Sequence, residues 1–112
     1  TIDYIVPKEV KRIAHGAFMR HSLATRDYFN ITIDHDMESI GDAAFYQSDI
    51  GTITINGHIE QIGKYAFSQT QLYEFICNGS IDYLAYHALP DKNYFIKLIL
   101  PASVRLDPSV FS

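Results

Sequence analysis

The chain has 112 residues and a mass of 12.8 kDa, which fits one domain. It is 47% hydrophobic and 20% charged, which is the composition of a folded globular protein and excludes a wholly disordered one. The net charge of -4 excludes a general nucleic-acid binder, since such proteins need a basic face. One cysteine excludes an internal disulfide and a multi-thiolate zinc site. No apolar run reaches the roughly 18 residues of a membrane helix, so no membrane insertion is expected.

A six-residue motif recurs along the chain, with a spacing of 22 residues in the centre. The segment Ile-Gly-Asp-Ala-Ala-Phe at 40–45 returns as Ile-Gly-Lys-Tyr-Ala-Phe at 62–67. Weaker copies stand at 13–18, 84–89 and 106–111. Between them lies a second unit with apolar residues at its first, fourth and sixth positions, as in Ile50, Ile53 and Ile55, and another four residues later, as at Ile59.

These two units give six apolar positions in each of five repeats, which start near residues 1, 28, 50, 72 and 95. Of the 30 positions 29 are apolar, whereas the composition alone would fill about 14, and the exception is Thr1. The alternating end of the second unit predicts a strand with one buried face, and the Ala-Phe segment predicts a short helical turn. Such a unit buries its apolar side only against its neighbours, so the sequence predicts an α/β solenoid with parallel strands.

Two departures from the regular spacing predict local irregularities. The first repeat has extra residues after Phe18, around Met19 to Ala24, which we expect to lengthen the helix or to form a loop. The fourth repeat has one extra residue near Pro90.

The repeats resemble the BspA-like class of leucine-rich repeats over essentially residues 1–112. The closest copies are Leu-Ile-Leu-Pro-Ala-Ser-Val at 98–104 and Ile-Gly-Lys-Tyr-Ala-Phe at 62–67. The resemblance implies a right-handed superhelix with strands on its concave face and helical turns opposite. It also implies a recognition or adhesion module of a secreted or cell-surface protein, without catalytic residues to carry over. We expect one domain that is part of a longer array.

The solvent-facing positions of the predicted strands form the candidate binding surface. One column holds Ile5, Thr32, Thr54, Ile76 and Ile99, and the column beside it holds Asp3, Asn30, Thr52, Glu74 and Lys97. Apolar and threonine side chains beside polar ones suit a protein or glycan partner. The site is therefore predicted at Thr32, Thr54, Ile76, Ile99, Thr52 and Glu74. Alternatively, these residues only satisfy strand propensity, and the chain is a structural spacer.

A hydrolase is the competing interpretation, because Asp36, His58 and Ser80 stand 22 residues apart and should stack in one column. Acid, base and nucleophile in that order are typical of serine hydrolases. However, the repeat pattern already places serine in this position, as at Ser103, and no sequence marks an oxyanion hole. An open rim would also leave the site wet, so the sequence predicts no enzyme.

Three further groups have a functional and a structural interpretation. Asp34, His35 and Asp36 with His58 could ligate a metal, but a polar turn gives the same string, so no metal or cofactor is expected. Asp34, Asn56 and Asn78 share a column in which polar side chains can bond from one repeat to the next. Cys77 falls in a buried position and should act as a small core residue.

The last repeat predicts self-association. Leu98, Leu100, Leu106 and Phe111 would expose one flank beside an unpaired strand edge. We therefore expect further repeats or end-to-end pairing with a second chain.

Overall fold

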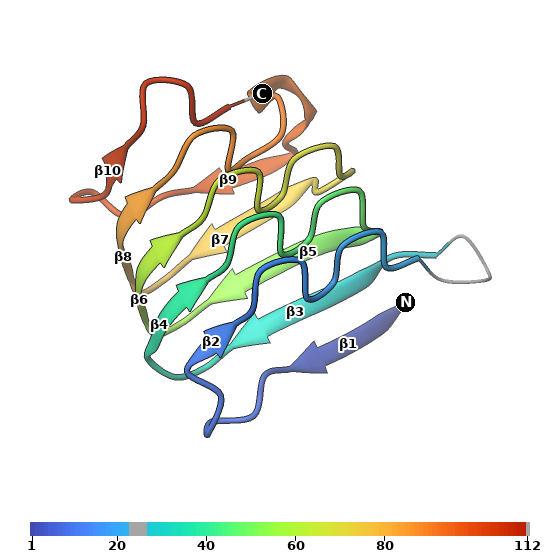
Figure 1. The fold of residues 1–112 in the computed structure, drawn as a ribbon, viewed down its shortest axis with the longest axis horizontal. Helices are drawn as coiled ribbons and strands as arrows, with labels where there is room; N and C mark the ends of the chain where they lie inside the picture. Colours follow the sequence, from blue (N-terminus) through green and yellow to red (C-terminus); the bar gives the residue numbers. More distant parts are fainter. Residues whose placement is uncertain (23–26, 112) are drawn as a thin grey trace.

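The computed structural model describes residues 1–22 and 27–111, which form a parallel β-solenoid with three sides (Figure 1). Two sides are five-stranded sheets. Sheet A has the strand order β1 (Ile2–Ile5), β3 (Phe29–Ile33), β5 (Ile50–Ile55), β7 (Glu74–Cys77) and β9 (Lys97–Ile99). Sheet B has the order β2 (Arg12–Ile13), β4 (Met37–Ile40), β6 (His58–Ile62), β8 (Ser80–Leu84) and β10 (Arg105–Leu106). Each turn of the solenoid, called a rung here, therefore gives one strand to each sheet.

Sheet A contains the strands that the alternating pattern predicts. The burial of β3 and β5 alternates, so Ile31 and Ile53 point into the core while Thr32 and Thr54 point outward. The register pairs Ile31 with Ile53 and Ile53 with Phe75, so the buried residues of successive rungs lie directly over one another. Branched side chains suit such a pleated, half-buried surface, and the predicted columns are confirmed.

Sheet B was not predicted. Its strands bury residues three apart, such as Met37 and Ile40 in β4 or Ile59 and Ile62 in β6, with two outward side chains between them. This spacing lacks the period of two by which a half-buried strand is recognised. The predicted apolar positions are nevertheless the buried ones, and the register stacks Met37 on Ile59 and Ile59 on Ile81.

The third side, here called the turn side, corrects the prediction of helical turns. It consists of consecutive tight turns at residues 15–20, 42–47, 64–69 and 86–87. In the described part of the chain the one helix is the 3-10 segment η1 (Lys92–Tyr94) near Pro90, and no helix there is long and apolar enough to cross a membrane. Of the extra residues after Phe18, 23–26 lie outside the described residues.

Alternating backbone hydrogen bonds explain why the turn side is not helical. The N–H groups of Ala44 and Tyr46 donate within their own turns, to Gly41 and Ala43. The N–H groups between them point to the next rung, as Phe45 donates to the carbonyl oxygen of Ala66 at 2.8 Å. This alternation needs left-handed backbone at two positions per rung, which breaks a helix. These positions are Gly16 and Arg20, Ala43 and Gln47, Tyr65 and Gln69, and His87.

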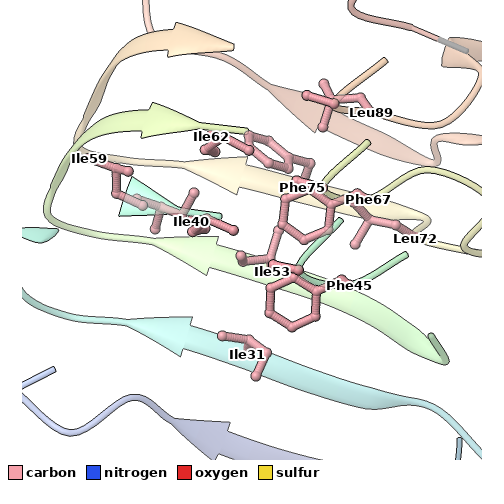
Figure 2. Close-up of a cluster of buried hydrophobic side chains, with 14 of the residues drawn as sticks. Ile31, Ile40, Phe45, Ile53, Ile59, Ile62, Phe67, Leu72, Phe75 and Leu89 are labelled. Atoms are coloured by element: carbon pink, nitrogen blue, oxygen red, sulfur yellow. The ribbon is translucent and has the colours of Figure 1, made fainter. Parts of the chain in front are cut away.

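The core fills the space enclosed by the three sides (Figure 2). Its centre is a stack of phenylalanine rings from the turn side, in which Phe45 lies 5.0 Å from both Phe18 and Phe67 and nearly parallel to each. Phe75 of sheet A meets Phe67 edge to face. Because aromatic side chains bury large apolar areas, this stack links the turn side firmly to sheet A.

The structure corrects one predicted core residue. Phe29, and not Tyr28, occupies the first buried position of the second repeat, opposite Ile50. The register of β3 and β5 shifts between Phe29 and Asn30, which leaves Gly51 as an extra residue on β5. Tyr28 is thereby half-buried at the surface.

The outer rungs are less buried than the centre. β1 is exposed along its length, and Leu106 of β10 is also exposed. β9 and β10 are edge strands of the two sheets. The end-to-end association inferred from the last repeat stays a prediction.

We expect Ala43→Gly to stabilise the protein by about 0.5–1 kcal/mol, because glycine adopts the left-handed backbone of this position (φ 53°) without the steric cost of a Cβ atom. Ala44→Gly is the matched control, since Ala44 is fully buried and is not among the left-handed residues. It should cost about 1 kcal/mol. Urea unfolding midpoints measure both, and equal losses in the two variants would contradict the prediction.

Candidate functional site

The outer face of sheet A carries the predicted binding residues in two columns. Thr32, Thr54, Ile76 and Ile99 pair in register from β3 to β9, as do Asn30, Thr52, Glu74 and Lys97. The structure therefore brings all six predicted site residues onto one surface. Thr32, Thr54 and Ile76 are half-buried by their neighbours, whereas Ile99 is 39% exposed.

Side chains of the polar column bond one another along the sheet. The Asn30 amide donates to the Asp3 carboxylate at 2.9 Å, and the Thr52 hydroxyl donates to Glu74 at 3.2 Å. These bonds join neighbouring rungs, which gives this column a structural task. The apolar and threonine column next to it has no such engagement for its isoleucines and offers surface that a partner can desolvate.

The third predicted column forms an amide ladder at the carboxyl ends of the sheet A strands. Asn78 donates from its amide to the side-chain oxygen of Asn56 at 2.8 Å, and Asn56 donates to Asp34 at 2.7 Å. The next residue in two of these rungs is glycine, because a Cβ atom at Gly79 would lie 2.0 Å from the carbonyl oxygen of Gly57. The structural interpretation of this column is confirmed.

The predicted hydrolase column is brought together only in part. The ring of His58 lies 2.7 Å from the Ser80 hydroxyl through Nδ1, as a base and nucleophile would. Asp36 does not contact the ring but accepts a hydrogen bond from the backbone N–H of His58 at 2.9 Å. The carboxylate beside the ring is Asp82, whose Oδ2 lies 3.2 Å from Nε2.

The surroundings of Ser80 lack what acyl transfer requires. An oxyanion hole needs N–H groups that are free to bind developing negative charge. The N–H groups of Gly79 and Ser80 both donate to carbonyl oxygens of the preceding rung, at Ile55 and Gly57. Ser80 is exposed, so water screens the electrostatic interactions that would drive the reaction.

The predicted metal grouping does not assemble in the described residues. His35 Nε2 lies 2.7 Å from the carbonyl oxygen of Val10, and one oxygen each of Asp34 and Asp36 accepts a hydrogen bond from the next rung. Residues 1–22 and 27–111 hold no group of three or more histidine, cysteine, aspartate or glutamate side chains placed to bind a metal ion.

Cys77 lies in the core as predicted. Burial raises the pKa of its thiol above the ordinary value, and a hydrogen bond from the Gly79 backbone offsets only part of this effect. Since the thiolate is the reactive form, Cys77 is a poor nucleophile.

The sequence did not predict a tyrosine-lined groove with a volume of about 1240 Å³. It lies where the turn side meets the amino ends of the sheet A strands, because Tyr28 precedes β3 and Tyr73 precedes β7. Its five tyrosines are Tyr28, Tyr46, Tyr65, Tyr73 and Tyr94. We call it the tyrosine groove.

Gly51 sets the shape of one wall of the tyrosine groove. Its missing side chain lets Tyr28 and Tyr73 meet edge to face at 5.8 Å, although they belong to rungs on either side of it. A Cβ atom at Gly51 would lie 2.9 Å from the Tyr73 ring. The only sequence signal for this groove is the tyrosine count of eight, because the register shift that places Gly51 between the rings has no mark in the apolar pattern.

Polar groups of the tyrosine groove are held by one another. The Tyr28 hydroxyl donates to the Gln71 side chain at 2.6 Å, and Gln69 accepts from the amide of Gln47 at 2.8 Å. Partial burial, and then the neighbouring Tyr86, raise the pKa of Tyr65 above its ordinary value, so its hydroxyl stays protonated at neutral pH.

We expect a fluorophosphonate probe to leave Ser80 unmodified, because no free N–H group stabilises the attack. Intact-mass spectrometry checks this, with trypsin as the positive control for the probe. A phosphonyl adduct on the parent chain that disappears in both Ser80→Ala and His58→Ala would contradict the prediction.

Comparisons with known proteins agree with the repeat architecture. The family model described as BspA type leucine rich repeat region (6 copies) matches residues 2–112. No curated protein and no solved structure matches the chain. Repeats of this family form modules for protein interaction or adhesion, on a solenoid that is generally non-catalytic. With two parallel sheets, stacked apolar columns and a match over nearly its whole length, the chain belongs to the BspA-type leucine-rich repeat family.

Proposed function

We propose that this chain is a non-catalytic recognition module that binds a protein partner through the outer face of sheet A. The observation that supports this most directly is the unbroken register of the column from Thr32 through Thr54 and Ile76 to Ile99. It presents alternating hydroxyl and apolar groups on a backbone fixed by hydrogen bonds on both sides. A rigid surface loses little conformational entropy when it binds.

A protein fits this face better than a small ligand does. Side chains that stand in continuous columns across five strands make an extended surface, whereas small molecules bind in concave sites. The neighbouring column carries both signs of charge, with Asp3 and Glu74 on one hand and Lys97 on the other. Such a mixture at the rim of an apolar stripe is typical of protein interfaces.

A secreted or cell-surface location is part of the proposal. Its support is family membership, since BspA-type repeats are typically found in surface or secreted proteins. A spacer without a binding face of its own is the rival interpretation. The hydrogen bonds of Asn30 and Thr52 favour it for the polar column, so the binding energy is expected from the column of Ile76.

We expect a photocrosslinking amino acid at Thr54 to capture a defined protein from the surface fraction of source cells or of cells they contact. The same amino acid at Gln61, an exposed residue of β6 on sheet B, is the matched control and should capture none. Mass spectrometry identifies the captured protein, which is then purified and titrated against the parent chain.

In that titration Ile76→Asp should weaken binding at least tenfold, about 1.4 kcal/mol, because it places a charge in the desolvated centre of the contact. Gln61→Asp should leave the affinity unchanged. Equal capture from Thr54 and Gln61, or an affinity insensitive to Ile76→Asp, would favour the spacer.

A further inference from the structure

We propose that the tyrosine groove is a second binding site, which takes an uncharged oligosaccharide. The groove lies at the corner between the turn side and sheet A, and its lining residues are not those of the outer face of sheet A. The proposal is therefore independent of the protein contact proposed above.

Aromatic rings line this groove on several rungs. Tyr46 and Tyr65 come from the turn side, Tyr73 from the segment before β7, and Tyr94 from η1. Tyr65 and Tyr94 are 40% and 70% exposed, so their rings are accessible to a ligand. The C–H faces of a pyranose ring are apolar and carry slightly positive hydrogens, which suit the negative face of an aromatic ring.

Hydrogen-bonding groups of both kinds stand beside the rings. The side-chain oxygens of Gln69 and Gln71 already accept bonds, from Gln47 and Tyr28, which leaves their amide N–H groups as donors to a ligand. The oxygen of Tyr28 and the carboxylate of Asp91 supply acceptors. Sugar hydroxyls both donate and accept, so a polyol can use both sets.

The charges of the groove favour a neutral ligand. Lysine and arginine are absent from its lining residues, and its one carboxylate is Asp91. A sulfated, phosphorylated or sialylated glycan would find no counter-charge there, and the net charge of -4 would oppose it.

The floor of the groove is held in place before any ligand arrives. The Thr70 hydroxyl donates to the carbonyl oxygen of Phe67 at 2.7 Å and accepts from the N–H of Leu72 at 3.3 Å. Thr70 itself is buried, as is Ser68 beside it. A preformed floor lowers the entropy lost on binding, which matters most for weak ligands such as single glycan chains.

A smaller hollow of about 310 Å³ continues the site beyond Tyr28, Gln69 and Gln71, which line both spaces. Ser48 lies at its base, and the hydroxyl of Ser48 is buried without a hydrogen-bond partner among the described residues. An unpaired buried hydroxyl is costly, so a polar group or water that reaches it through this hollow would be stabilised.

A proline-rich peptide is the other ligand that aromatic grooves bind. Its carbonyl groups only accept hydrogen bonds, so it would leave the acceptors of Tyr28 and Asp91 unused. In addition, the contact between the Tyr28 and Tyr73 rings closes the gap into which a proline side chain would insert. These two features favour the sugar.

The test is a titration of the isotope-labelled chain with cellotetraose, maltotetraose and mannotetraose, followed by amide chemical shifts. Sialyllactose, a heparin tetrasaccharide and a proline-rich peptide are the comparison ligands. At least one neutral sugar should shift the amides of Gln69, Gln71 and Tyr94 with a Kd near about 1 mM, and leave those of Thr32 and Thr54 unshifted.

The variant Tyr94→Ala, combined with Gln71→Ala, should weaken the bound sugar at least tenfold. Both residues are exposed, so the fold should be retained, and the urea midpoint checks it. The matched control combines Tyr83→Ala and Gln61→Ala on sheet B and should bind as the parent does.

Three results would overturn the proposal. They are no shift with any neutral sugar up to about 10 mM, unchanged affinity in the groove variant, and binding of only the anionic sugars or the peptide. None of them bears on the crosslinks from Thr54, so the two proposals can fail separately.

Discussion

Backbone hydrogen bonding from one rung to the next is the constraint on which the whole molecule depends. In the two sheets it is the ordinary parallel ladder, with every strand paired to the strand of the next rung. On the turn side every second N–H group does the same, as in the bonds from Phe45 to Ala66 and from Phe67 to Ala88. All three sides are thus joined along the solenoid axis, and buried polar backbone groups find partners without a helix.

This constraint also determines what the surface can present. Because each rung copies the register of its neighbour, a residue type that repeats in the sequence becomes a continuous column in space. The phenylalanine stack, the amide ladder of Asn56 and Asn78 and the threonine column of sheet A all arise in this way. The His58–Ser80 contact has the same origin, which is why its geometry alone is weak support for catalysis.

The sequence predicted the parts of the fold that follow from the repeat of apolar residues. The spacing of Ile53 and Phe75 was enough to place them on adjacent layers, and the polar positions between buried ones were enough to place the outer columns. Sheet B was missed because its buried residues, such as Ile59 and Ile62, are three apart and do not alternate. The turn side was taken as helical because nothing in alanine or tyrosine indicates left-handed backbone at Ala43 or Tyr65, where the next rung imposes it. The tyrosine groove depends on the register shift at Gly51, which only the pairing of real strands reveals.

The residues added to the regular rung all enter at a single corner. The pairs Ile13–Ile40 and Ile31–Ile53 are 27 and 22 residues apart, so the first excess falls between Phe18 and Asn30. The single extra residue of the fourth repeat falls between Leu89 and Leu98, where η1 bulges outward. The opposite corner cannot vary in the same manner, because Gly57 and Gly79 nearly touch the carbonyl oxygens beneath them. Length changes during evolution are therefore steered toward the edge that holds Tyr28 and Tyr94, so new ligand preferences can arise there while the coil itself is left untouched.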